Sequence, residues 1–302
     1  MKPCTSTNIH EKYLDKPYYF TLEESLYACN EAGFQAIDLN LHRASLSGGP
    51  LENDSTWRAW VEKIGLIRDE LGVTFPSAHS YFYVWWPVQD LEQLTRHEVL
   101  VSRSIEAAGT LGVEHLVVHP YSVSDQAWYS QKKSIEYNLK FMEKYAEIAC
   151  RYKNLHLAIE NMVEGLDKRR FGSSAEDLLQ LDYVLNDSIF GLCWDFGHGM
   201  RSHTNPIASL RQLGNRLKVV HVHDINEDSD HMLPFFGIIK WVEIMPIMKE
   251  IGFEGYWNYE CPNYTINLPL DLRAKALKFA YEVNTTMIDG DFALVAPLFR
   301  EN

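Results

Sequence analysis

Val219-Val220-His221-Val222-His223-Asp224 is an apolar run that becomes polar at its carboxyl end. Side chains of a strand alternate between its two faces, so His221 and His223 share one face while Val220 and Val222 share the other. Two imidazoles therefore point where valines would normally pack. Taken alone, the run is equally compatible with a buried strand that contains hydrogen-bonded histidines. The ends of the other strands decide between the two interpretations.

Apolar strand runs alternate with helical periodicity along the whole chain. The expected strands are Lys2 to Thr7, Phe34 to Leu39, Val73 to His79, His115 to His119, Leu155 to Glu160, Phe190 to Asp195, Leu217 to His223 and Gly255 to Glu260. The expected helices are Thr21 to Ala32, Ser55 to Leu71, Leu91 to Leu111, Lys133 to Arg151, Ser174 to Leu185, Pro206 to Leu213, Trp241 to Ile251 and Leu270 to Val283. Such alternation predicts parallel strands with right-handed crossovers.

Eight strand and helix units in 302 residues favour a single (β/α)8 TIM barrel over an open doubly wound sheet. We expect one domain over residues 1–302, with residues 285–302 as an extension that covers a barrel face or another subunit. A homo-oligomer is the expected assembly. No G-x-G-x-x-G or P-loop sequence follows a strand, so a dinucleotide or P-loop site has no support.

Composition limits the classes of partner. The chain is 46% hydrophobic, lacks an apolar run long enough to span a membrane, and does not begin with a signal peptide, so we expect a cytoplasmic protein without membrane contact. Five scattered cysteines without a C-x-x-C pair indicate reduced thiols. The net charge of −13, from 41 acidic and 28 basic residues, disfavours a nucleic-acid partner, because such partners are held by neutralising phosphates.

The expected strands end on side chains that can bind a metal or transfer a proton. The last inward residues of six strands are His79, His119, Glu160, Asp195, His223 and Glu260. The carboxyl ends of barrel strands meet at one mouth, where these groups would repel or desolvate one another unless a cation lay among them. Mixed imidazole and carboxylate donors suit Mn²⁺, Zn²⁺, Co²⁺ or Fe²⁺ better than Ca²⁺. The residues leave the choice open among these ions and Mg²⁺.

At several positions the sequence resembles the sugar phosphate isomerase/epimerase superfamily with a xylose isomerase-like barrel, which also contains the endonuclease IV type of AP endonuclease family 2. The matching runs are Ala158-Ile159-Glu160-Asn161, Asp195-Phe196-Gly197-His198, His221-Val222-His223-Asp224, Asp230-His231 with Gly237 and Trp241, and Gly255-Tyr256-Trp257-Asn258-Tyr259-Glu260. Their order and spacing carry the resemblance, which covers nearly the whole chain.

The resemblance implies a divalent metal held by Glu160, Asp195, His223 and Glu260, with His79 and His119 as further candidates. It also implies an isomerase or epimerase of a sugar or sugar phosphate. In such enzymes two glutamates, here Glu160 and Glu260, act as base and acid in a 1,2-proton transfer through a metal-stabilised enediolate.

The candidate substrate-binding residues come from several strand ends and loops. His198 matches a histidine that touches substrate in the ketose epimerases, and Asp224 is a candidate for holding an imidazole or a substrate hydroxyl. The full candidate set is His198, His79, His119, His231, Asp224, Trp85 and Lys168. Lys168 begins a basic run, Lys168-Arg169-Arg170, that fits either a phosphate or carboxylate or a solvated charge run. The ketose epimerases carry an arginine where this chain has Ser229, so substrate recognition is not a copy of theirs.

Three alternative functions remain open. A dehydratase of a keto-polyol, of the inosose type, needs the same metal and bases to abstract a proton before a hydroxyl leaves. An endonuclease IV-like phosphodiesterase would use His79 and His119 as well, but the acidic balance and the Ser229-Asp230-His231 motif, whose aspartate is one place off, disfavour it. A non-catalytic sugar-binding barrel would be expected to lose acid and base residues first, and they are all present.

Overall fold

The computed structural model of this chain describes residues 1–11, 20–82, 91–123, 129–164 and 169–290. Eight parallel strands form a closed barrel in sequence order, with β1 paired to both β2 and β8. The strands are β1 (Lys2–Ser6), β2 (Ile37–Asn40), β3 (Ser77–His79), β4 (His115–Val118), β5 (His156–Glu160), β6 (Phe190–Asp195), β7 (Leu217–Val222) and β8 (Tyr256–Tyr259). The predicted (β/α)8 TIM barrel is confirmed.

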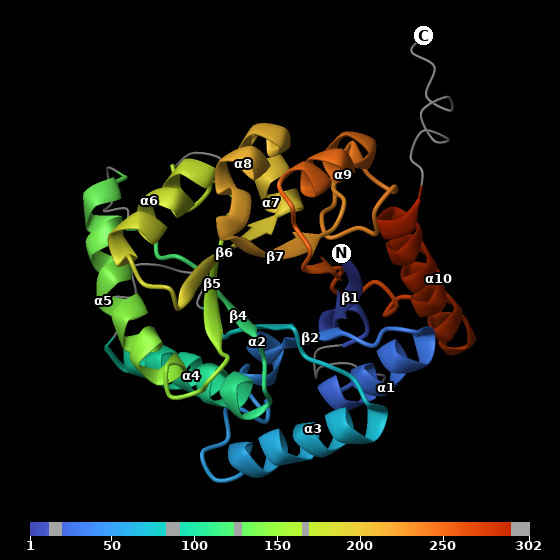
Figure 1. Cartoon of the computed structure of the whole chain (residues 1–302). Coiled ribbons are helices and arrows are strands. Elements are labelled where there is room, and N and C mark those ends of the chain that lie inside the picture. The colour runs from blue at the N-terminus through green and yellow to red at the C-terminus, as the bar shows by residue number, and fades with distance from the viewer. Residues whose placement is uncertain (12–19, 83–90, 124–128, 165–168, 291–302) are drawn as a thin grey trace.

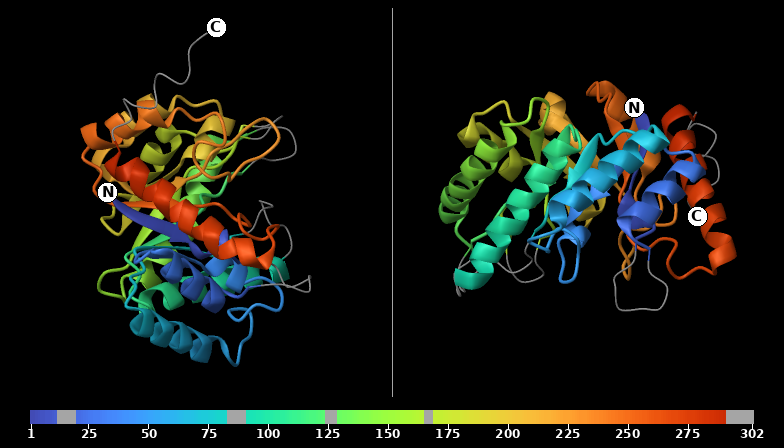
Figure 2. Two further views of the ribbon diagram at one scale, coloured as in Figure 1. Left: turned by 90° about the vertical axis from the view of Figure 1, so that its right-hand side faces the viewer. Right: turned by 90° about the horizontal axis from the view of Figure 1, so that it is seen from below.

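A ring of helices surrounds the strands (Figure 1). The helices that follow or precede the strands are α1 (Leu22–Ala32), α3 (Trp57–Leu71), α4 (Leu91–Thr110), α5 (Gln131–Ala149), α6 (Ala175–Leu185), α8 (Pro206–Leu213), α9 (Trp241–Glu250) and α10 (Leu270–Asp289). Helix α10 lies beside α1 and β1, which closes the ring (Figure 2). None of the described helices combines the length and apolar composition that a membrane crossing requires.

Helix ends follow local capping chemistry. Thr21 and Glu24 form a capping box at the start of α1, and Gly72 ends α3 in the left-handed conformation. Four short elements were not predicted from the sequence: η1 (Thr7–Ile9), α2 (Leu41–Ala44), α7 (Phe196–Arg201) and η2 (Gly214–Arg216). Each is too short to show helical periodicity.

Part of the expected extension, 285–289, is instead the last part of α10, and residues 291–302 lie outside the described part of the chain. The helix continues because its carboxyl half packs on the barrel. Asn284 donates hydrogen bonds from Nδ2 to the carbonyl oxygens of Cys4 and Trp257, and Met287 is fully buried. These contacts hold α10 against β1 and β8.

The apolar core is divided between two places. The larger part fills the space between the strands and the helices. A separate cluster of Val117, Ala158, Cys193 and Val219 comes from β4, β5, β6 and β7. On each of these strands the residue two positions further along is polar, so the apolar cluster lies directly beneath the strand-end residues.

Candidate metal centre

Strand register determines which polar residues meet at the mouth. Asp195, the last residue of β6, pairs with His221 of β7 because the register shifts by one residue between Leu192 and Cys193. On the other side of β7, His221 pairs with Asn258. The shift therefore brings His221, in place of Val220, alongside Asp195 in the sheet.

Four buried residues bring one donor atom each to within 4.8 Å of the others: Glu160, Asp195, His221 and Glu260. Nδ1 of His221 lies 2.7 Å from Oε1 of Glu160 and 2.9 Å from Oε2 of Glu260. The Nδ2 amide of Asn8, which sits in η1, donates to Oε1 of Glu260 at 3.4 Å. Three of the expected ligands, Glu160, Asp195 and Glu260, are in this group, and its histidine is His221.

Three carboxylates this deeply buried require positive charge among them. Although burial opposes ionisation of Glu160, the imidazoles of His221, His119 and His79 hold its pKa well below the usual range. Burial likewise disfavours a charged His221, yet Cys193, Glu260 and Glu160 raise its pKa well above the ordinary value. The same donors, three carboxylates and one imidazole, fit a divalent cation.

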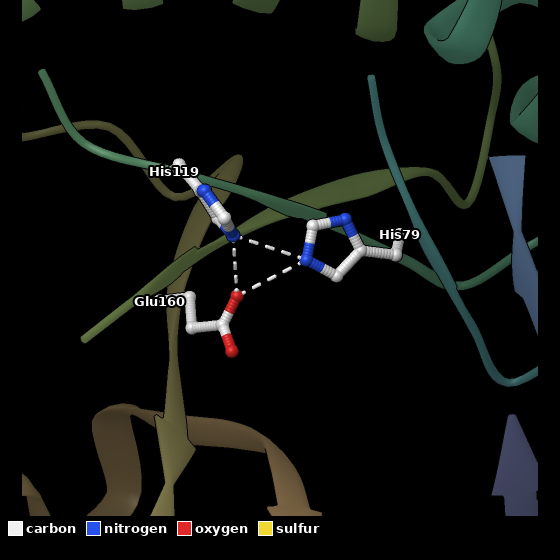
Figure 3. Close-up of side chains that lie close together, drawn as sticks. All are labelled: His79, His119 and Glu160. Atoms are coloured by element: carbon white, nitrogen blue, oxygen red, sulfur yellow. Dashed lines mark hydrogen bonds and ion pairs between the residues drawn. The ribbon is translucent and has the colours of Figure 1, made fainter. Parts of the chain in front are cut away.

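A second group shares Glu160 and adds two histidines (Figure 3). Nε2 of His119 lies 2.9 Å from Oε2 of Glu160 and 3.1 Å from Nε2 of His79, which is itself 3.2 Å from that oxygen. Nδ1 of His79 donates to the carbonyl oxygen of Ser80 at 2.9 Å, so a neutral His79 presents a lone pair to the carboxylate. Lone pairs at such distances need a shared proton or a cation between them.

His223, the expected histidine ligand, lies beside Asp195 and forms with Asp195 and His231 a further group that could hold a metal ion. Its Nδ1 accepts the backbone N–H of His231 at 3.0 Å, and its Nε2 donates to Oδ1 of Asp195 at 2.9 Å. Both ring nitrogens are thus used. The ring packs against the backbone of Gly197, where a Cβ would overlap Cε1 of His223. His223 thus contacts both oxygens of the Asp195 carboxylate.

The segment after β6 places His198. Asp195 caps α7 by accepting the backbone N–H of His198 at 2.6 Å, and Nδ1 of His198 donates to the carbonyl oxygen of Asn161 at 2.9 Å. Asn161 in turn donates from Nδ2 to the carbonyl oxygen of Asp195 at 2.9 Å, which ties the ends of β5 and β6 together. Nε2 of His198 is left for a ligand.

The carboxylate of Asp224, a candidate for holding an imidazole or a substrate hydroxyl, accepts four hydrogen bonds from the segment that follows it. Its Oδ1 accepts the backbone N–H groups of Ile225 and Ile239, and its Oδ2 accepts those of Phe235 and the Trp241 indole, all at 3.0 Å. The carboxylate is fully buried and does not line the cavity described below. Asp224 therefore holds the loop between β7 and α9 in place.

A cavity of about 220 Å³ opens above the donors. Its lining residues are His79, Phe82, His119, Glu160, Met162, Val163, Arg170, His198, His231 and Glu260. The ring of Phe82 stacks between His42, at a centroid distance of 3.8 Å, and His119, at 4.2 Å. Four of the expected substrate-binding histidines thus face one cavity. Trp85 and Lys168 lie outside the described residues.

Several polar residues near the site were not singled out from the sequence. Asp38 on β2 is buried and accepts a hydrogen bond from Ser77 at 2.6 Å, and burial raises its pKa. Asn8 approaches the site from a segment without strand periodicity. A strand-end rule could have identified Asp38, because it lies two residues before the end of β2, but nothing in the sequence marked Asn8.

Two curated proteins are similar to this chain in sequence. The chain is 27% identical to an uncharacterized protein of Sinorhizobium fredii over 284 residues, 84% of each chain. It is 27% identical over 128 residues to an inosose dehydratase of Clostridium beijerinckii, which covers 36% of this chain and 43% of the dehydratase.

Solved structures share the fold at lower identity. A D-tagatose 3-epimerase-like protein is 22% identical with a TM-score of 0.71, over 96% of this chain and 98% of its own. The IolI protein with a bound zinc atom is 17% identical with a TM-score of 0.70, over 95% and 98%. The family profile described as xylose isomerase-like TIM barrel matches residues 26–283. This chain belongs to the xylose isomerase-like TIM-barrel family.

Proposed function

We propose that this protein is a divalent-metal-dependent isomerase or epimerase of a sugar or sugar phosphate. The observation that carries the proposal is the pair of buried carboxylates, Glu160 and Glu260, that meet at the His221 imidazole and also line the cavity. Glu160, Asp195, His221 and Glu260 would hold the cation. The zinc atom in the similar IolI structure supports a metal in this fold.

The chain's own residues can position a substrate and move a proton. A bound divalent cation supplies Lewis acidity, which polarises a carbonyl group and lowers the cost of negative charge on oxygen. One of Glu160 and Glu260 then accepts the proton from the carbon beside that carbonyl, and the other returns a proton to the opposite face or the neighbouring carbon. Phe82 and Met162 cover apolar parts of the cavity and keep water from the reacting carbon.

Solvent exchange tests this proposal directly. The protein loaded with Mn²⁺, Co²⁺ or Zn²⁺ is incubated with a panel of ketoses and their phosphates in deuterated water. We expect deuterium at the carbon beside the carbonyl, and loss of the label with Glu160→Gln. A panel without any labelled member, at full metal occupancy, would contradict the proposal.

Dehydration is the second candidate reaction, and the inosose dehydratase of Clostridium beijerinckii among the relatives favours it. It begins with the same proton abstraction, but a hydroxyl on the next carbon then leaves as water. The same panel separates the two reactions, because a dehydratase accumulates a dehydrated ketone instead of returning labelled starting material. Adding keto-inositols to the panel covers this class.

A further inference from the structure

Arg170 contributes a positive charge to the cavity over the candidate metal centre. It lines this cavity together with Glu160, Glu260 and His119. Arg170 and His119 also line a second, smaller cavity together, beside Phe82 and Tyr121. Among the described residues, none provides an acceptor within hydrogen-bond or ion-pair distance of the Arg170 guanidinium. Burial lowers the pKa of Arg170, and the charge of Glu164 offsets this effect only in part, so an anionic ligand would stabilise the guanidinium further.

The neighbouring arginine is a contrasting case. Arg169 forms ion pairs with Glu164 and Asp177 and lies 5.3 Å above the ring of Tyr129. Its charge is fully used in holding the loop after β5 to the start of α6. Two consecutive arginines therefore differ in role, and only Arg170 is directed to the cavity.

The backbone around Arg170 is fixed from both sides. The N–H of Arg170 donates to Glu164, and the N–H of Phe171 donates to Oγ of Ser122 at 2.9 Å. Gly172 has a φ of +88°, and a Cβ there would overlap the Pro120 ring. Since Phe171 is fully buried, the turn cannot easily move Arg170 out of the cavity. A cation held this way is preorganised for a ligand.

We propose that Arg170 selects substrates with an anionic group, a phosphate or a carboxylate, and that it binds this group while the reacting carbon faces Glu160 and Glu260. This inference rests on the proposed function and narrows its substrate class to anionic sugar or polyol derivatives. A guanidinium donates paired hydrogen bonds to two oxygens of either anion, which neutral hydroxyl groups cannot match. Glu160 and Glu260 would repel the anion from their own end of the cavity, so the substrate has one productive orientation.

The first test compares substrates that share the reacting carbon and carbonyl group but differ in the group at the other end of the molecule. Deuterium exchange is measured with the metal-loaded protein on a neutral ketohexose, its terminal phosphate ester and the corresponding keto acid. We expect Arg170→Met to lower kcat/KM for the preferred anionic compound about 10- to 100-fold, the range for charge-assisted hydrogen bonds, with little change for the neutral sugar. Arg170→Lys should restore part of the loss. Arg151→Met, which removes one exposed charge at the end of α5, is the matched control.

The second test needs no turnover. Binding of inorganic phosphate and of glycerate is measured by calorimetry at a fixed metal content, with wild type, Arg170→Met and Arg151→Met. We expect the anion signal to fall only in Arg170→Met, and the tighter of the two anions identifies the substrate's group. Equal rates for neutral and anionic sugars, with anion binding unchanged in Arg170→Met, would overturn the inference. Anion binding that depends on Arg170 without any deuterium exchange would refute the proposed reaction but support the anion site.

Discussion

Two layers of the barrel interior differ in the side-chain property that matters: volume in the lower layer and the identity of the donor atom in the upper layer. The lower layer consists of Val117, Ala158, Cys193 and Val219, and two residues further along the same strands lie His119, Glu160, Asp195 and His221. In the lower layer any side chain of suitable volume fills the space. In the upper layer the identity of each donor atom decides whether charge is balanced. On these four strands, residues that fill space therefore lie only two positions before residues that carry charge or donor atoms.

Of the predicted effects, the largest should come from substituting one of the two proton-transfer glutamates of the upper layer, and it should be a loss of exchange rate. Glu260→Gln keeps the volume but removes the base, so we expect exchange in deuterated water to fall about 10²- to 10⁴-fold. The measurement is the initial rate of label uptake by nuclear magnetic resonance at saturating metal. Glu254→Gln, on the exposed loop before β8, is the control and should keep the wild-type rate. An equally active Glu260→Gln protein would remove this residue from the mechanism.

Substitution of His221, in β7, and of His223, just after β7, tests which imidazole binds the metal directly. We expect His221→Gln to abolish tight binding of Mn²⁺ or Zn²⁺, whereas His223→Gln should weaken it only about 10- to 100-fold, as for residues that orient a ligand. Competition with a chromophoric chelator measures both affinities. The reverse order would show that His223 is the ligand, as the sequence had suggested.

In the lower layer, a change in side-chain volume should alter the stability of the protein. Ala158→Leu adds three carbon atoms to a fully buried position, and we expect it to lower the free energy of unfolding by about 1–3 kcal/mol. Urea denaturation of the metal-free protein measures this change. Ala59→Leu, on the exposed face of α3, makes the same substitution without crowding and should leave stability nearly unchanged. Equal effects of both variants would argue against a tightly packed lower layer.

The smallest expected effect is a change in the pH dependence of stability, and it comes from a histidine at the opposite end of the barrel. Burial, together with His156 and Lys218, lowers the pKa of His115 to about 4. The unfolded chain, with a histidine pKa of about 6.5, then binds more protons between these values, so stability falls as the pH drops from 6.5 towards 4. The contribution at pH 5 is at most about 2 kcal/mol.

His115→Gln should therefore flatten the acid side of the stability curve, which thermal unfolding at pH 5 and pH 7.5 measures. His203→Gln replaces an exposed histidine and serves as the control. An identical loss of stability in wild type and His115→Gln would mean that His115 is already charged in the folded protein.

The architecture followed from the sequence because strand periodicity and helix caps are local. Glu160, Asp195 and Glu260 were found at strand ends for the same reason. The contacts of His221 with Glu160 and Glu260 could not be predicted in this way, because they depend on how neighbouring strands pack. The hydrogen bonds of Asp224 show the same limit, and for Arg170 the sequence left open whether its basic run binds an anion or is solvated. Loop contacts turn Asp224 into an anchor, while the locked turn at Gly172 directs Arg170 to the cavity.

The contact between Gly197 and His223 has an evolutionary consequence. No side chain fits at Gly197 while the imidazole at His223 is present, although Gly197 itself offers no side chain to any ligand. The two positions are thus expected to change together in descendants of this sequence. In rounds of random mutagenesis that start from His223→Ala and keep folded variants, we expect substitutions at Gly197 to be accepted. Restoring histidine at position 223 should then require glycine at position 197 again.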